Sequence, residues 1–307
     1  MRNRFTFAIV SFHLYMYVLH GMKIYPCAKI NLGLNVVARR ADGYHDLETV
    51  FYPINISDEI EISVVAGENS RYLSSGGGRC EVEIAVAEGR VGGWFDIIGT
   101  ADDNLIARAY RMLAADFELP DMKFVLRKCI PIQAGMGGGS ADCAFTLRAI
   151  NDMMRLGLSD DKLREYATRL GADCAFFVNP QPSYAEGIGE KLTPIDLSLK
   201  EYKIVIVKPP VAVSTKVAFS GVDVAIPIRS CREIVMQPIE TWRAELHNDF
   251  EKTVFAVHPE LGVIKKRLYS LGAVYASMSG SGSAIYGIFR SVPSLDGEFR
   301  GCFKSVL

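Results

Sequence analysis

The chain has 307 residues, of which 49% are hydrophobic and 22% charged, and its formal net charge is -1. This length predicts two domains with sizeable cores, and the near-zero charge excludes a strongly basic surface for nucleic acid or anionic membranes. Seven scattered cysteines include no C-x-x-C pair, so neither a zinc cluster nor a disulfide framework is predicted, and a reducing, cytoplasmic setting is expected.

The first 21 residues differ from the rest of the chain. Arg2 and Arg4 precede a mostly apolar stretch, a pattern that resembles a signal peptide. The stretch is short for a membrane span, lacks a small-x-small cleavage site and is interrupted by His13. We therefore expect residues 1–21 to be a leader outside the fold and Met22 to be the true start, with secretion as the alternative.

The first half of the chain contains two predicted strands, a loop-rich segment, a helix and a third strand. Residues 23–37 and 49–65 are rich in Val, Ile and aromatic residues, which predicts strands, and "RRADGYHD" between them carries the hairpin signal Asp42-Gly43. Residues 66–93 are rich in glycine and are expected to form loops or short hairpins. The segment "DDNLIARAYRMLAADF" predicts a helix behind an aspartate cap, and residues 122–130 predict a strand.

The second half mixes helices and strands without a regular alternation. Helices are predicted over "SADCAFTLRAINDMMRLGL", from the cap Ser159 to Gly171, and over residues 260–271. Strands are predicted over "ADCAFFV", "YKIVIVKPP", "AVYASMS" and "AIYGIF", the last two joined by "GSGS". This order favours an α+β fold in two domains, residues 22–180 and 181–307, with a boundary in the Pro- and Gly-rich "NPQPSYAEGIGE".

The segment "PIQAGMGGGSADCAF" places four glycines among residues 135–139, where a strand is expected to hand over to a helix opened by Ser140. Free backbone N–H groups at the positive end of a helix form an anion site, and phosphate is its usual occupant. No lysine follows, which excludes a Walker loop, and the third glycine of the dinucleotide fingerprint is missing. The alternative is a tight junction in which the glycines serve packing.

Three segments resemble the GHMP kinases, the family of galactose, homoserine, mevalonate and phosphomevalonate kinases. They are the glycine segment, "PCAKINLGLNVVARRADGYHDLETVF" near the start and "SMSGSGSAIYGIF" near the end. The resemblance covers nearly all of the chain from Met22. It implies a ribosomal S5 domain 2-like N-terminal domain and a ferredoxin-like C-terminal domain. The narrower stretch "AKINLGL…RRADGYH" resembles the branch of the family that phosphorylates the 2-hydroxyl of 4-diphosphocytidyl-2-C-methyl-D-erythritol, in the non-mevalonate isoprenoid pathway.

The resemblance implies ATP and Mg²⁺ as cofactors. The glycine loop, defined here as residues 131–141, is expected to bind ATP through Pro131, Gly135, Met136, Gly137, Gly138, Gly139, Ser140 and Ala141. Met136 stands where leucine is usual, and Ala141 where a second serine is common. The metal ligands are not identified by the sequence.

The resemblance also implies two catalytic residues. Asp173 in "LGADCAFFV" corresponds to the family's carboxylate near the acceptor hydroxyl, and Lys29 in "CAKINLGL" corresponds to its partner, which stabilises the transferred charge. From the residues alone, a loop aspartate more often bonds nearby backbone, and a strand lysine more often faces solvent.

Five further residues are expected to bind the acceptor. Tyr44 offers a stacking face for cytosine, and His45 offers a ring donor and acceptor for its edge. The resemblance adds Asn31, places Phe219 on the other face of cytosine and assigns Thr215 to the erythritol part. For Phe219, core packing is a serious alternative.

Two alternatives stay open at this point. One is another GHMP kinase of the homoserine or mevalonate type, and the other is a non-catalytic nucleotide-binding paralogue. The "RRADGYH" turn favours a cytidine-containing acceptor, and the presence of both Lys29 and Asp173 favours an active enzyme. The expected partner is a small-molecule substrate, with neither nucleic acid nor membrane, for a monomer or weak homodimer.

Overall fold

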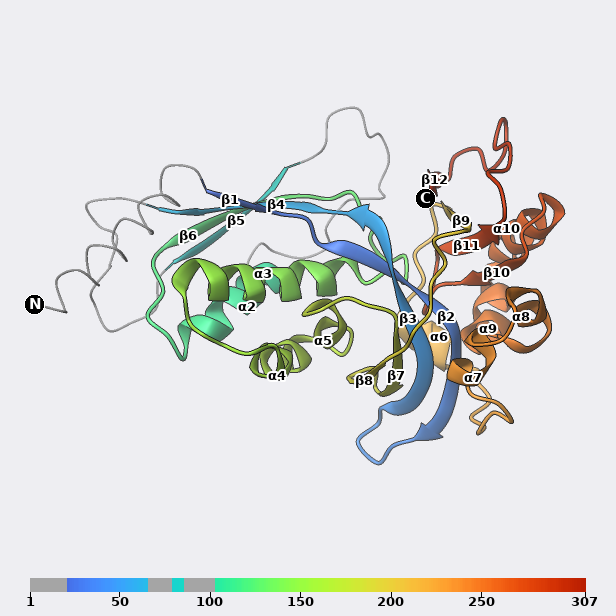
Figure 1. The fold of residues 1–307 in the computed structure, drawn as a ribbon, viewed down its shortest axis with the longest axis horizontal. Helices are drawn as coiled ribbons and strands as arrows, with labels where there is room; N and C mark the ends of the chain where they lie inside the picture. The colour runs from blue at the N-terminus through green and yellow to red at the C-terminus, as the bar shows by residue number, and fades with distance from the viewer. Residues whose placement is uncertain (1–20, 66–78, 86–102) are drawn as a thin grey trace, which may run out of the picture.

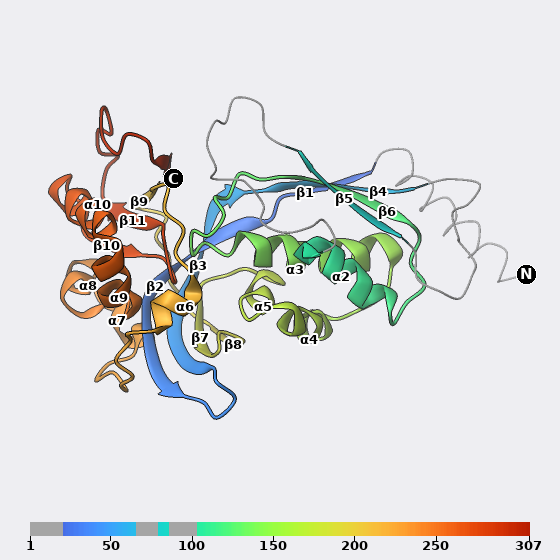
Figure 2. The same cartoon turned by 180° about the vertical axis from the view of Figure 1, so that it is seen from behind.

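The computed structural model describes residues 21–65, 79–85 and 103–307. The expected leader, apart from Gly21, lies outside these residues, as does most of the glycine-rich segment 66–93. None of the helices in the described ranges is long and apolar enough to cross a bilayer. Figures 1 and 2 show an elongated molecule in which two long strands, β2 (Cys27–Arg39) and β3 (His45–Ser57), run between an N-terminal and a C-terminal half.

The first sheet, with strand order β1-β4-β6-β5, is covered on one face by helices (Figure 1). Its strands are β1 (Met22–Ile24), β4 (Glu59–Val64), β5 (Cys80–Ala85) and β6 (Met122–Arg127). β5 and β6 are parallel, and the other pairs are antiparallel. The helices are α2 (Leu105–Ala114), α3 (Gly138–Met154), α4 (Asp160–Leu170) and α5 (Cys174–Phe177). Their apolar side chains and those of the sheet form one core, which fixes α3 and the glycine loop before it.

The second sheet has the order β2-β3-β7-β8 and is antiparallel throughout. Its strands are β2 (Cys27–Arg39), β3 (His45–Ser57), β7 (Ser183–Gly187) and β8 (Lys191–Pro194). β2 and β3 form the hairpin that Asp42-Gly43 predicts, and Gly43 takes a φ of +87° in its turn. β3 precedes residue 180 in the chain and β7 follows it, and the two strands are hydrogen-bonded to each other. This sheet therefore contains residues of both expected domains. The division at that residue stays a prediction.

The C-terminal half contains the third sheet, an antiparallel one with the order β10-β11-β9-β12. Its strands are β9 (Lys203–Lys208), β10 (Tyr275–Met278), β11 (Ile285–Phe289) and β12 (Phe303–Val306). The helices of this half are α6 (Thr215–Phe219), α7 (Cys231–Val235), α8 (Ile239–Glu245), α9 (Phe250–Val257) and α10 (Pro259–Ser270). Side chains of β2 share one core with β9 and β11, which joins the two halves.

Several predicted elements are confirmed. α4 begins after its cap Ser159, whose side chain accepts from the amide of Lys162, and it ends at Gly171. The strands β9, β10 and β11 and the helix α10 lie where the sequence predicts them. The mixed content of helices and strands confirms an α+β fold.

Four details of the prediction are wrong. The segment "ADCAFFV" was predicted as a strand but contains the helix α5. The prediction failed because a short, fully buried apolar run has no periodicity that distinguishes a helix from a strand. Asn104, not an aspartate, caps α2. Each of the two expected N-terminal strands is divided into two: Pro26, which lacks an N–H, separates β1 from β2, and Asp58 separates β3 from β4. α3 begins at Gly138, so Ser140 lies in its first turn. The short helices α6 to α9 had no predicted counterpart.

Candidate active site

The two residues expected to carry catalysis lie next to each other. Lys29 is on β2, Asp173 is the N-cap of α5, and Lys29 Nζ is 3.3 Å from Asp173 Oδ2. The side chain of Lys29 is 3% exposed and that of Asp173 is 33% exposed. A buried ammonium needs a compensating charge, which Asp173 supplies. The pair therefore holds a buried positive charge beside a carboxylate that a small molecule can reach.

Further contacts hold Lys29 in place. Its Nζ donates to Asn31 Oδ1 and lies 4.8 Å from the centre of the Phe51 ring. Its main-chain N–H donates to the carbonyl of Met136 at 3.0 Å. This last bond attaches β2 to the glycine loop, so the lysine and the loop keep a fixed relation.

The glycine loop has a backbone that side chains would prevent. Gly135 and Gly137 have φ values of +70° and +72°, and a Cβ on Gly135 would lie 1.9 Å from the Ser279 carbonyl oxygen. Gly137 is the N-cap of α3, whose first N–H groups have no partner within the helix. They border a cavity of about 430 Å³, here called the glycine-loop cavity, lined by Leu105, Lys128, Pro131, Ile132, Gln133, Ala134, Gly135, Met136, Gly137, Gly138, Gly139 and Ser140. The cavity lies where the sequence predicts an anion site.

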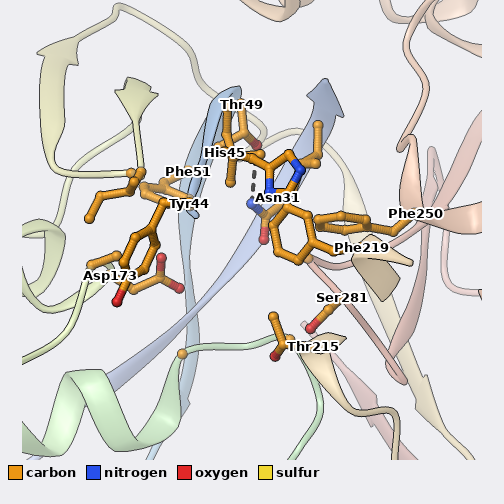
Figure 3. Close-up of a pocket in the computed structure, with 18 of the residues that line it drawn as sticks. Asn31, Tyr44, His45, Thr49, Phe51, Asp173, Thr215, Phe219, Phe250 and Ser281 are labelled. Atoms are coloured by element: carbon orange, nitrogen blue, oxygen red, sulfur yellow. Dashed lines mark hydrogen bonds between the residues drawn. The ribbon is translucent and has the colours of Figure 1, made fainter. Parts of the chain in front are cut away.

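A second cavity, of about 510 Å³, lies beside the Lys29–Asp173 pair and is here called the acceptor cavity. Figure 3 shows the rings and polar groups around it. Its lining includes every residue expected to bind the acceptor, namely Asn31, Tyr44, His45, Thr215 and Phe219. Gly135 and Gly137 line both cavities, so the two cavities lie on either side of these glycines.

The comparisons with known proteins identify the family. Residues 104–180 match the GHMP kinases N-terminal domain, and residues 231–295 match the GHMP kinases C-terminal domain. A 4-diphosphocytidyl-2-C-methyl-D-erythritol kinase of Bacteroides fragilis strain YCH46 is 45% identical over 93% of this chain and 100% of its own length. The chain belongs to the GHMP kinase family.

Further relatives support the assignment of this chain to the GHMP kinase family. A 4-diphosphocytidyl-2-C-methyl-D-erythritol kinase of Porphyromonas gingivalis is 41% identical over 92% of this chain and 98% of its own length. A crystal structure of 4-(cytidine 5'-diphospho)-2C-methyl-D-erythritol kinase matches with a TM-score of 0.65 and 29% identity, covering 87% of this chain and 90% of the other. A homoserine kinase from Cytophaga hutchinsonii, at 16% identity and a TM-score of 0.60 over 92% and 94% of the two chains, shares the fold.

A buried charged cluster that was not predicted from the sequence lies at the glycine-loop cavity of this kinase. Lys128 Nζ is hydrogen-bonded to Asp58 Oδ2 and, at 2.9 Å, to Asp142 Oδ2. Asp58 Oδ1 also accepts from the main-chain N–H groups of Cys129 and Ile130, at 2.5 and 2.8 Å. Lys128 lines the cavity, while Asp58 and Asp142 lie behind it. A basic residue three positions before Pro131 is the one signal in the sequence that points to this cluster.

Burial and the neighbouring charges together shift the pKa values of Asp142 and Lys128 in the kinase. Burial raises the pKa of Asp142 to about 7, Lys128 opposes the rise, and the nearby Asp58 carboxylate adds to it. Burial lowers the pKa of Lys128, but attraction to Asp142 and Asp58 outweighs it and leaves that pKa above its ordinary value. Lys128 therefore keeps its charge, and the cluster is neutral when Asp142 carries a proton.

The third sequence motif braces the glycine loop of this kinase. Ser279 Oγ donates to the carbonyl of Gly135 at 2.8 Å and accepts from the main-chain N–H of Asn31 at 3.2 Å. Asn248 Nδ2 donates to the carbonyls of Met278 and Gly280, both at 2.8 Å. Ser279 and Asn248 were not singled out from the sequence, because each acts through contacts with distant segments.

Most predicted residues of the GHMP kinase line a cavity, and the surroundings of three of them need description. Ala141 is fully buried in the first turn of α3 and is absent from the lining of both cavities. Phe219 stacks on His45, with ring centres 4.7 Å apart and planes inclined by 23°, and its ring also contacts that of Phe250. Tyr44 is 62% exposed and lines the same cavity as the stack (Figure 3).

Proposed function

We propose that this GHMP kinase transfers the γ-phosphoryl group of ATP to the 2-hydroxyl of 4-diphosphocytidyl-2-C-methyl-D-erythritol, in the non-mevalonate isoprenoid pathway. The observation that carries the proposal is the position of the Lys29–Asp173 pair in the acceptor cavity, whose wall at Gly135 and Gly137 also borders the glycine-loop cavity. The names of relatives at 38–45% identity support the choice of acceptor.

In this proposal, the triphosphate lies against the glycine loop. Free N–H groups at the start of α3 and the positive end of its dipole bind the phosphates, and Lys128 adds a positive charge on the cavity wall. The bracing of Gly135 by Ser279 keeps these N–H groups fixed before ATP arrives. Fixed donors stabilise developing charge without a reorganisation cost at the moment of reaction.

Asp173 orients the acceptor hydroxyl in the acceptor cavity. The hydroxyl oxygen forms a bond with the γ-phosphorus while the bond to the β-phosphate oxygen breaks, and the hydroxyl proton passes to the Asp173 carboxylate. A loose, metaphosphate-like transition state makes early removal of that proton unnecessary. Lys29 stabilises the negative charge on the transferred group, from a position fixed by Asp173 and Asn31.

Mg²⁺ is the metal that the family resemblance implies, and the described residues fit a weakly held ion. In the described ranges, no three His, Cys, Asp or Glu side chains form a metal-binding group. Mg²⁺ in nucleotide sites takes one or two carboxylates together with phosphate oxygens and water. Asp173 and the hydroxyl of Ser140, both at the cavities, would hold it. It would neutralise phosphate charge when bound.

The cytidine part is assigned to the aromatic end of the acceptor cavity. His45 and Phe219 contact each other, so a base stacked on Phe219 displaces His45 to the edge of the ring, where its nitrogens donate and accept. Tyr44, which is mostly exposed at the cavity rim, offers the opposite stacking face. Thr215, at the start of α6, is left for the erythritol hydroxyls.

An ATP-consumption assay with three acceptors tests this proposal. The chain is expected to consume ATP with 4-diphosphocytidyl-2-C-methyl-D-erythritol and to show background rates with homoserine and mevalonate. Turnover with either of the latter alone would contradict the acceptor, and background rates with all three would contradict the kinase activity. We also propose a cytoplasmic setting and a monomer or weak homodimer, which fractionation and sedimentation test.

A further inference from the structure

A series of buried hydrogen bonds runs from Lys29 into the second sheet. Lys29 Nζ donates to Asn31 Oδ1, and Asn31 Nδ2 donates to Thr49 Oγ1 at 3.1 Å (dashed in Figure 3). Thr49 Oγ1 in turn donates to the carbonyl of Gly33. The side chains of Lys29, Asn31 and Thr49 are 3%, 2% and 2% exposed. Water therefore does not compete for these bonds, and each has the strength of a buried one.

The direction of each bond fixes the orientation of the Asn31 carboxamide. An ammonium has donors alone, so the carboxamide has to turn its oxygen toward Lys29. The Thr49 hydroxyl has one hydrogen, which goes to Gly33, and its oxygen is left to accept from Asn31 Nδ2. A flipped carboxamide would place an NH₂ group against the ammonium and an oxygen against the hydroxyl oxygen. The hydroxyl of Thr49 thus admits one orientation of Asn31.

A β-bulge supplies the acceptor at the end of the series. Between Leu32 and Leu34 the register of β2 shifts by one residue against β3, so Gly33 is the extra residue opposite Thr49. Gly33 has a φ of +70°, and a Cβ there would lie 2.5 Å from Leu246 Cδ1. The bulge therefore requires glycine, and its carbonyl is the group that takes the Thr49 hydrogen.

We propose that Thr49 is a positioning residue of the reaction: it fixes the orientation of the Asn31 carboxamide and thereby keeps Lys29 Nζ beside Asp173. The proposal rests on the proposed phosphoryl transfer, in which Lys29 stabilises the transferred group. Thr49 acts through Asn31 and is not itself catalytic. Thr49 lines the acceptor cavity and is absent from the lining of the glycine-loop cavity, so its loss is expected to lower the rate of transfer without changing the KM for ATP.

The kinetic test compares Thr49→Val, which removes the hydroxyl at nearly constant volume, with Thr49→Ser, which keeps it. Loss of such a supporting hydrogen bond typically costs about 10–100-fold in activity. We expect Thr49→Val to lower kcat by this factor with an unchanged KM for ATP, and Thr49→Ser to restore most of kcat. The matched control is Thr146→Val, because the Thr146 hydroxyl is buried without a hydrogen-bond partner among the described residues, and the kcat of this variant should equal that of the wild type. If Thr49→Val does not fold, Thr49→Ala tests the same hydroxyl.

Hydrogen exchange of the Asn31 side-chain NH₂, followed by NMR, tests the orientation without any turnover. The wild type should show a protected NH₂ signal, and Thr49→Val should lose the protection. A wild-type kcat in both Thr49→Val and Thr49→Ala, or an unchanged NH₂ signal in them, would overturn the proposal. A wild type that phosphorylates no acceptor would instead overturn the proposed function, while protection lost in Thr49→Val would still support the fixed orientation.

Discussion

Replacing Asp142 with asparagine should remove a pH dependence of folding stability. Asp142 is 3% exposed, and burial raises its pKa to about 7 from an ordinary value of 3.8. The folded state therefore binds more protons than the unfolded state between about pH 4 and pH 7, and its stability falls as the pH rises through this window. One pKa unit corresponds to about 1.4 kcal/mol, so Asp142 changes the free energy of unfolding by at most about 4 kcal/mol across this window. Asparagine imitates the protonated acid and cannot lose a proton.

Urea unfolding of the wild type and Asp142→Asn at several pH values measures this effect. We expect the free energy of unfolding of the wild type to fall between about pH 4 and pH 7, and that of Asp142→Asn to fall less, so that the variant gains relative stability as the pH rises. Asp161→Asn is the matched control, because the Asp161 side chain is 91% exposed and the same charge is removed. Parallel pH profiles for the wild type and Asp142→Asn would refute the reasoning.

Three further predictions concern the acceptor cavity, the glycine loop and the leader. His45→Ala should raise the KM for the acceptor more than the KM for ATP, since His45 lines the acceptor cavity and not the glycine-loop cavity. Equal rises in the two KM values would contradict this placement. Gly135→Ala should lower the free energy of unfolding by about 2–4 kcal/mol in urea titrations, because its Cβ would meet the Ser279 carbonyl. Gly157 also has a positive φ, but a Cβ there would meet no described atom within 4 Å, so Gly157→Ala should lose only about 1 kcal/mol of stability from backbone strain. Equal losses of stability in the two variants would contradict the clash at Gly135. A chain that begins at Met22 should fold and keep its activity, whereas an insoluble product would give residues 1–21 a role.

The sequence predicts the parts of the site that local rules control. A dense run of glycines before an amphipathic segment specifies a loop and a helix start, and the structure places α3 there. The hairpin at Asp42-Gly43 brings Tyr44 and His45 to the cavity as the turn residues indicate. The pairing of Lys29 with Asp173 was predicted from the family resemblance, because no local pattern relates a lysine on β2 to the N-cap of α5.

The parts that the sequence did not predict depend on contacts between distant segments. Asp58 and Lys128 meet because β4 and β6 pair, and neither residue carries a local signal of its partner. The bulge at Gly33 depends on the space left by Leu246 and Cys231. The helix α5 was taken for a strand because all four of its residues are buried, which leaves no polar face to reveal a helical period.

Single-turnover transfer by Asp173→Asn tests the central claim, that the Lys29–Asp173 pair receives the acceptor hydroxyl, most directly. Binding of ATP without Mg²⁺, measured by calorimetry, should match the wild type, because Asp173 does not line the glycine-loop cavity. The rate of phosphoryl transfer to 4-diphosphocytidyl-2-C-methyl-D-erythritol should fall by about 10²–10⁴-fold, the usual contribution of a positioned acid–base group. A transfer rate near that of the wild type would remove Asp173 from the reaction and contradict the claim.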